Sequence, residues 1–254
     1  MPHMGPLDAA CAAMTLPSEL LDAALHFRGD LYRNIVSLRE TQDLADDLSD
    51  RAGAAALLAK AEMATKPRLP APGLHRPFEE GYGQAIQFPF VPKHWFRTRF
   101  SDGSFGVWYG SPTLETTVHE TVHHFHRKLV EDPGFTDHTE PIVAERRVYR
   151  VAADALLIDL RPQVETHPAL RDPDSWDFCQ QLGRSLRDAG HPGLITQSAR
   201  CEGDNVALLE PRYLSNVRDH CYLRYVCKPG SRSVSVERRP GRRWMSIEVA
   251  GGNP

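Results

Sequence analysis

The sequence is poor in cysteine, and the cysteines that it has form no pattern. Among 254 residues there are five cysteines, with no C-x-x-C pair and without the even number that a disulfide framework needs. Free thiols of this kind are typical of proteins in a reducing compartment. We therefore expect a soluble, cytoplasmic protein.

Long apolar runs, nucleotide-binding loops and an excess of one charge are also absent. No apolar segment approaches the ~18 residues that a membrane span needs. The formal net charge is −3 at pH 7, which gives no electrostatic reason to expect nucleic acid or a membrane as partner. No G-x-G-x-x-G or Walker-type loop is present. The sequence therefore contains neither of these two phosphate-binding loops, so a nucleotide-binding function cannot be inferred from them.

Two helices are predicted before residue 66. Residues 18–47 carry apolar side chains at helical spacing, and residues 51–64 are rich in Ala and Leu. A Pro-rich connector, K-P-R-L-P-A-P-G, follows at residues 66–73. We expect a helical N-terminal extension over residues 1–66 and a main domain over residues 67–254. The extension is either a cap on the main domain or a surface for an oligomer or a partner.

In the main domain, strands outnumber helices and seldom alternate with them. This order predicts an α+β fold with a mixed sheet, and it argues against a doubly wound nucleotide fold. Besides a central helix that begins near Ser111, a helix is predicted at 173–189. Strands are predicted at 105–109, 142–151, 156–160, 193–197, 206–209 and 221–227, followed by a hairpin of 233–237 with 244–249.

The central helix is amphipathic in an unusual way. Ser111 is predicted as its N-cap and Pro112 as its first residue. The apolar residues that form its core face are Leu114, Val118, Val122, Phe125 and Leu129. A different face carries Thr113, Thr117, Glu120 and His124. Small hydroxyls around a single carboxylate suit the wall of a pocket, and an ordinary exposed glutamate is the alternative.

The same helix contains H-E-x-x-H, from His119 to His123. Two histidines four residues apart on one helix face can bind zinc, with Glu120 beside them as general base. The extended form of the motif fails because its glycine is missing and its third histidine is replaced by Leu129. A zinc-dependent hydrolase is therefore kept as an alternative.

A second pattern is spread more widely along the chain. Arg99 is followed after ten residues by Tyr109 and after eleven more by Glu120, and Ser198, Asn205 and Pro211 come much later. Over about residues 74–215 this order resembles the RES-domain family, the toxins of bacterial toxin–antitoxin pairs that degrade or use NAD. Tyr109, Glu120 and Ser198 look like the catalytic tyrosine, glutamate and serine of that family.

The first two arginines of the family pattern look like Arg76 and Arg99, although Arg97 or Arg28 could take the place of Arg76. Three positions depart from the pattern: Thr98 stands for a glycine, Gln197 for a proline and Glu210 for an asparagine.

The resemblance implies an ADP-ribosyltransferase-like architecture and an enzyme that cleaves the nicotinamide–ribose bond of NAD. ADP-ribose would pass to phosphate or water, with transfer to a protein side chain as the alternative. NAD is then a substrate, and neither a cofactor nor a metal is expected. The implied partner is an antitoxin with an Xre-type DNA-binding domain, and a homo-oligomer is left open.

The residue types suit this chemistry. Cleavage leaves positive charge on the ribose, which the carboxylate of Glu120 would stabilise. Arg76 and Arg99 offer planar, bidentate donors for the pyrophosphate. Tyr109 offers a ring for nicotinamide and a hydroxyl for the ribose. Ser198 and Asn205 complete the substrate-binding set, with Ser198 as a hydrogen-bond donor and not a nucleophile, and closure of a turn is the alternative role for Asn205.

Overall fold

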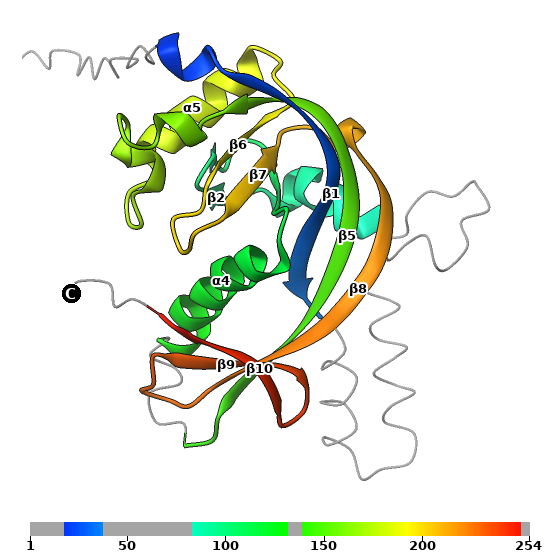
Figure 1. Cartoon of the computed structure of the whole chain (residues 1–254), viewed down its shortest axis with the longest axis vertical. Helices are drawn as coiled ribbons and strands as arrows, with labels where there is room; N and C mark the ends of the chain where they lie inside the picture. The colour runs from blue at the N-terminus through cyan, green and yellow to red at the C-terminus, as the bar shows by residue number, and fades with distance from the viewer. Residues whose placement is uncertain (1–17, 38–82, 132–138, 250–254) are drawn as a thin grey trace, which may run out of the picture.

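The structure is a computed structural model that describes residues 18–37, 83–131 and 139–249 (Figure 1). Its main feature is an eight-stranded sheet in the order β10-β9-β8-β5-β6-β7-β4, with β1 paired to β5 outside this path. The strands are β1 (Ala24–Val36), β4 (Trp108–Gly110), β5 (Ile142–Asp159), β6 (Gly193–Gln197), β7 (Asp204–Leu208), β8 (Leu214–Cys227), β9 (Ser233–Arg239) and β10 (Arg242–Glu248).

The sheet is mixed, because β5 and β6 run parallel whereas the other neighbours are antiparallel. The α+β prediction is therefore confirmed. Strand β5 is the longest element: β1 pairs along one edge of it and β8 along the other. Figure 1 shows these three strands side by side and strongly curved.

Five strands close on themselves at one end of this sheet. Tyr32 of β1 and Ser111, just after β4, exchange two backbone hydrogen bonds of 2.7 and 3.0 Å. Strands β1, β5, β6, β7 and β4 thus form a ring. The ring surrounds a core cluster that includes Leu31, Trp108, Leu157 and Val206.

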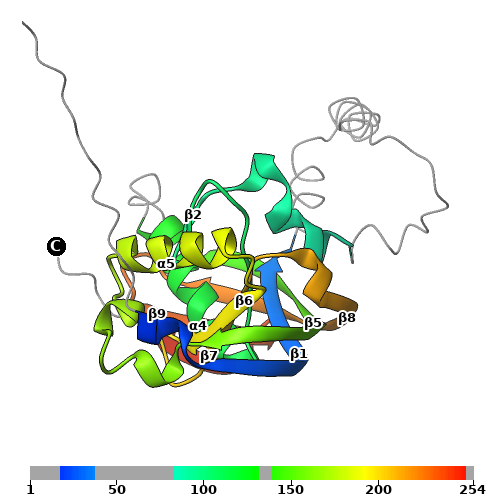
Figure 2. The ribbon, with the colours of Figure 1, turned by 90° about the horizontal axis from the view of Figure 1, so that it is seen from above.

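Two α-helices, α4 (Leu114–Phe125) and α5 (Asp177–Asp188), lie on the concave side of the curved strands (Figure 1). Helix α4 is extended by a π-helical turn, His126–Val130. Figure 2 shows α5 above strands β1, β5 and β6. The connections contain the short helices η1 (Ser18–Leu21), η2 (Phe88–Phe90), η3 (Pro92–His94), η6 (Arg161–Gln163), η7 (Pro168–Arg171) and η8 (Pro211–Tyr213). Within the described residues no helix is long and apolar enough to cross a membrane.

The predicted helix over residues 18–47 is wrong over its described part. Ser18–Leu21 is a short 3₁₀ helix and Ala24–Val36 is strand β1. Leu25, Leu31 and Ile35 fit a period of two as well as a helical one, and all three contact the core of the ring. Pairing of every residue from Ala24 to Val36 with β5 decides between the two periods. The second predicted helix, 51–64, and the connector at 66–73 lie outside the described residues.

Most of the other predicted elements are present with shifted ends. The predicted strands 142–151 and 156–160 are one strand, β5, and strand 105–109 is reduced to Trp108–Gly110. The C-terminal hairpin of β9 and β10 is confirmed. Helix 173–189 begins only at Asp177. The cap of α4 is Thr113 and not Ser111, because the Thr113 side chain accepts a hydrogen bond from the Thr116 backbone N–H.

Candidate functional site

Glu120 is carried by α4, whose opposite face is fixed in the core. Val118 and Val122 are fully buried and pack, with Leu114 and Phe125, against apolar residues of β5, β8 and β9. The side chains of Thr117 and Thr121 donate hydrogen bonds of 2.7 Å to backbone carbonyls one turn earlier in the helix. The half-buried Glu120 thus projects from a rigid helix.

Two donors from the sheet hold the carboxylate of Glu120. The Ser198 hydroxyl, just after β6, donates to Oε1 at 2.6 Å, and Asn205 Nδ2, in β7, donates to the same oxygen at 2.7 Å. Ser198 is fully buried. The structure therefore brings Glu120 together with two predicted site residues that lie 78 and 85 positions later in the chain. The pocket-wall interpretation of this helix face fits these contacts better than an ordinary exposed glutamate does.

The loop from Ser198 to Gly203 lies very close to α4. A Cβ atom at Gly203 would lie 2.1 Å from Thr116 Oγ1, so only glycine fits without a shift of the helix or the loop. The loop is closed by a 2.7 Å hydrogen bond from the Ser198 backbone N–H to the Gly203 carbonyl. This close approach is what brings Ser198 within reach of Glu120.

Tyr109, in β4, binds the segment that carries Arg99 through its hydroxyl. Its hydroxyl lies 2.8 Å from Thr98 Oγ1 and accepts a 3.0 Å hydrogen bond from the Phe100 backbone N–H. Burial raises the pKa of Tyr109 to about 12, against the opposing effect of these hydrogen bonds. The hydroxyl is therefore neutral at physiological pH, and it fixes the residues on both sides of Arg99.

Arg99 lies between β2 (Arg97–Thr98) and β3 (Ser101–Asp102). Its guanidinium donates to the backbone carbonyls of Asp172, at 2.8 Å, and Leu170, at 3.4 Å. Leu170 belongs to η7, and Asp172 begins the connection from η7 to α5. Both hydrogen-bond acceptors are neutral, and the carboxylate of Asp172 lies within electrostatic range of Arg99. The guanidinium therefore keeps donors that an anion can use.

Arg200 belongs to the site, although the sequence analysis assigned it no role. Its backbone N–H donates to Ser198 Oγ at 3.0 Å, and its guanidinium donates to the Pro173 carbonyl at 3.0 Å. Burial lowers the pKa of Arg200, the nearby Glu120 opposes this effect, and Arg99 adds to it. Arg200 therefore lies within electrostatic range of both residues. The only sequence signal was its position two residues after Ser198.

The three candidates for the first family arginine have different places. Arg76 lies outside the described residues. Arg28 is exposed on β1, where it lies 3.6 Å from Asp154. Arg97 lies two residues before Arg99 and donates a 3.0 Å hydrogen bond to Gln180 of α5. Of the two described candidates, only Arg97 is next to the Glu120 and Arg99 region.

The H-E-x-x-H histidines have no third ligand in the part of the chain that the structure describes, since no group of three His, Cys, Asp or Glu residues there could hold a metal. Burial lowers the pKa of His119, and burial together with Arg200 and further cationic groups lowers that of His123 to about 4. A cationic setting of this kind disfavours a divalent metal. Glu120, the general base of a zinc site, is held here by Ser198 and Asn205.

The comparison with known families decides the relationship that the spacing of these residues indicates. The family model described as RES domain matches residues 74–227. The chain belongs to the RES-domain family. The match contains Arg76, Arg99, Tyr109, Glu120, Ser198 and Asn205, and it extends through β8 beyond the 74–215 of the resemblance.

Among solved structures, this RES-domain protein is similar to a chain of the M. tuberculosis MbcT–MbcA toxin–antitoxin complex. The two share 14% identity and a TM-score of 0.42, over 80% of this chain and 90% of that one. No curated protein matches the sequence.

Proposed function

We propose that this RES-domain protein cleaves the nicotinamide–ribose bond of NAD and passes ADP-ribose to phosphate or water. The observation that carries the proposal is the carboxylate of Glu120, held by Ser198 and Asn205 and lying within electrostatic range of Arg200. A half-buried, oriented carboxylate beside permanent cations is the combination that a positively charged sugar next to a pyrophosphate requires.

Glu120 would act on the sugar. As nicotinamide leaves, positive charge develops on the ribose, and a fixed negative charge stabilises this transition state more than the ground state. Both sheet donors contact Oε1, so Oε2 is the oxygen that can face the ribose. Ser198 and Asn205 then serve as orienting donors.

The arginines would hold the pyrophosphate. Arg99 and Arg200 are anchored to the carbonyls of Asp172 and Pro173, two neighbours in one segment, so their guanidiniums are fixed relative to each other. Fork-shaped cations in fixed positions suit phosphate oxygens. Arg76, which the family resemblance assigns to the same task, adds a third cation to this proposal.

The test is a direct assay of purified protein with NAD. Released nicotinamide reports cleavage, and separation of free ADP-ribose from its 1″-phosphate, with and without added phosphate, identifies the acceptor. Labelled NAD with a bacterial lysate reveals any ADP-ribosylated protein, which is the alternative reaction. Intact NAD after prolonged incubation with folded protein would refute the proposal.

We also propose that the protein acts as a toxin restrained by an antitoxin with an Xre-type DNA-binding domain, as the family resemblance implies. An enzyme that destroys NAD in its own cell has to be held inactive until it is needed. Arg99 and Arg200 give the partner a simple target, because an acidic segment placed on them would occupy the substrate's place through charge-assisted hydrogen bonds.

A further inference from the structure

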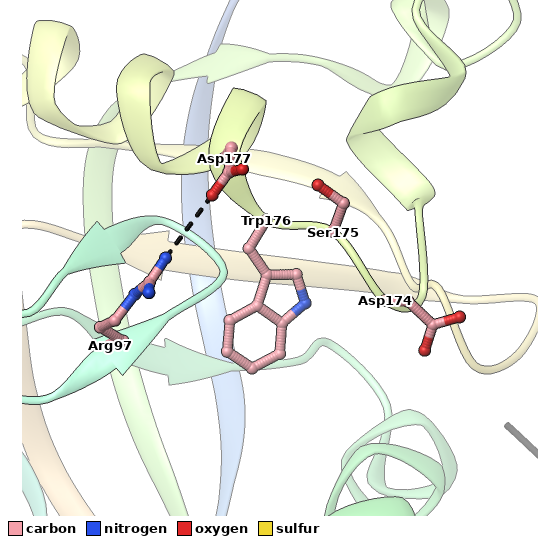
Figure 3. Close-up of a pocket in the computed structure, with 5 residues that line it drawn as sticks. All are labelled: Arg97, Asp174, Ser175, Trp176 and Asp177. Carbon is pink, nitrogen blue, oxygen red and sulfur yellow. Dashed lines mark ion pairs between the residues drawn. The ribbon is translucent and has the colours of Figure 1, made fainter. Parts of the chain in front are cut away.

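A cavity of about 460 Å³ opens between strand β2 and the beginning of α5. It is lined by Arg97, Asp174, Ser175, Trp176 and Asp177 (Figure 3). None of these residues makes a hydrogen bond or ion pair with Glu120, Ser198 or Asn205, and the cleavage chemistry proposed above does not use them. The volume is that of an ordinary small-molecule site.

The cavity wall continues the segment that anchors the two arginines. Arg200 is within electrostatic range of Glu120 and also contacts the Pro173 carbonyl, while Arg99 contacts that of Asp172. The next residues of this segment, from Asp174 onward, form the cavity wall. A dinucleotide with its reacting ribose at Glu120 and its pyrophosphate on the arginines can place its second nucleoside in this cavity.

The lining has the chemistry of a nucleoside site. The large aromatic ring of Trp176 can stack against a base. Its indole N–H is enclosed and has no hydrogen-bond partner among the described residues. Figure 3 shows the ring below the beginning of α5, with Asp177 turned toward Arg97.

Two carboxylates complete the lining, and neither is strongly held. Asp177 lies 3.5 Å from Arg97, and Asp174 lies 3.5 Å from Arg127. All four side chains are at least half exposed, and such ion pairs contribute little to stability. Either carboxylate can thus exchange its arginine for the hydroxyls of a ribose.

We propose that this cavity binds the adenosine of NAD, with adenine against Trp176 and the 2′-hydroxyl of its ribose on Asp177, and that it thereby selects NAD over NADP. This inference rests on the proposed function and adds its substrate specificity. The 2′-phosphate of NADP would bring close to two further negative charges beside Asp174 and Asp177. Arg97, the one cation in the lining, donates a hydrogen bond to Gln180 of α5, which holds its guanidinium on that helix.

The first experiment compares three substrates: NAD, NADP and nicotinamide mononucleotide, which has the reacting ribose but no adenosine. We expect Trp176→Ala to raise the KM for NAD about tenfold through lost stacking and to leave the kinetics with the mononucleotide unchanged. Trp176→Phe should restore most of the lost affinity for NAD. Equal effects of Trp176→Ala on NAD and the mononucleotide would overturn the proposal.

Asp177→Asn tests the selectivity. Wild type should prefer NAD over NADP by about tenfold or more in kcat/KM, and the variant should reduce this ratio about tenfold because one repelling charge is removed. Asp188→Asn, the same exchange at the other end of α5, is the matched control and should leave the ratio unchanged. A ratio unaffected by Asp177→Asn contradicts the assignment of the ribose to this carboxylate.

Binding of AMP, measured by calorimetry, separates this inference from the proposed function. AMP should bind to wild type and lose about tenfold in affinity in Trp176→Ala. If NAD is cleaved but AMP binding ignores Trp176, the adenosine site is wrong while the function stands. If AMP binding depends on Trp176 but NAD stays intact, the site stands and the cleavage proposal fails.

Discussion

Replacement of Glu120 by glutamine is the sharpest perturbation that the structure offers. Ser198 and Asn205 both donate to one oxygen, Oε1. The carbonyl oxygen of a glutamine side chain can accept both hydrogen bonds in the same place. Glu120→Gln therefore removes the charge while it keeps the shape and the two contacts.

The expected loss follows from what the charge does. A well-placed charge in a partly buried site stabilises the transition state by ~3 kcal/mol, which is about a hundredfold in rate. We expect this loss in kcat with little change in the KM for NAD, because the substrate's ground state carries no positive charge on the ribose. Each hydrogen bond to a neutral acceptor is weaker by about 1 kcal/mol, so a modest fall in Tm is expected as well.

Nicotinamide release by purified wild type, Glu120→Gln and Glu115→Gln is the assay. Glu115 is exposed in the first turn of the same helix, so its variant controls for the loss of one negative charge from α4. Circular dichroism shows whether each variant is folded. Folded Glu120→Gln protein that cleaves NAD at the wild-type rate would refute the role of this residue.

Four further predictions test the rest of the molecule. Gly203→Ala should lower the free energy of unfolding by about 1–3 kcal/mol and should also slow NAD cleavage, because the added Cβ would push α4 away from the loop. Gly83→Ala is the control: it has open space around it and should change neither quantity. Below pH 6.5 His123 of the unfolded chain takes up a proton, whereas in the folded protein His123 accepts one only near pH 4. The Tm of the wild type should therefore fall between pH 6.5 and pH 4, and it should fall less in His123→Gln. Chelation with EDTA should leave NAD cleavage unchanged, and elemental analysis should find no stoichiometric zinc; about one zinc per chain with loss of activity would support the zinc alternative. Expression of the chain alone should stop bacterial growth as NAD falls. Co-expression with a neighbouring reading frame that encodes an Xre-type protein should restore growth and yield a complex on purification. Growth without any fall in NAD would contradict the toxin proposal.

Local sequence patterns predicted the elements that carry the site. The spacing of Leu114, Val118 and Val122 placed α4 and set Glu120 on a face away from the core. Strands β6 and β7 were predicted because short apolar runs lie between turn residues. The positions of α4, β6 and β7 could be inferred because each depends on residues that are close together in the sequence.

Long-range pairing decided what local patterns left ambiguous. The leucines of residues 24–36 satisfy a helical and a strand period alike, and only the antiparallel partner β5, more than a hundred residues later, makes this segment a strand. The aromatic run around Tyr109 predicts a strand but not the contacts of its side chain. Only the structure shows that its hydroxyl fixes Thr98 and Phe100 on either side of Arg99.

The sequence by itself was enough to predict the family, from the spacing of a few residues along the chain, and the fold class, from the order of its strands and helices. Tertiary structure alone decided that Arg200 lies within electrostatic range of Glu120 and that Arg97 and Trp176 line one cavity. Nothing in the local sequence around Arg97 refers to α5, some eighty residues later. The two meet because Gln180 of α5 bonds both Arg97 and the Thr98 carbonyl, and such contacts depend on the packing of the whole chain.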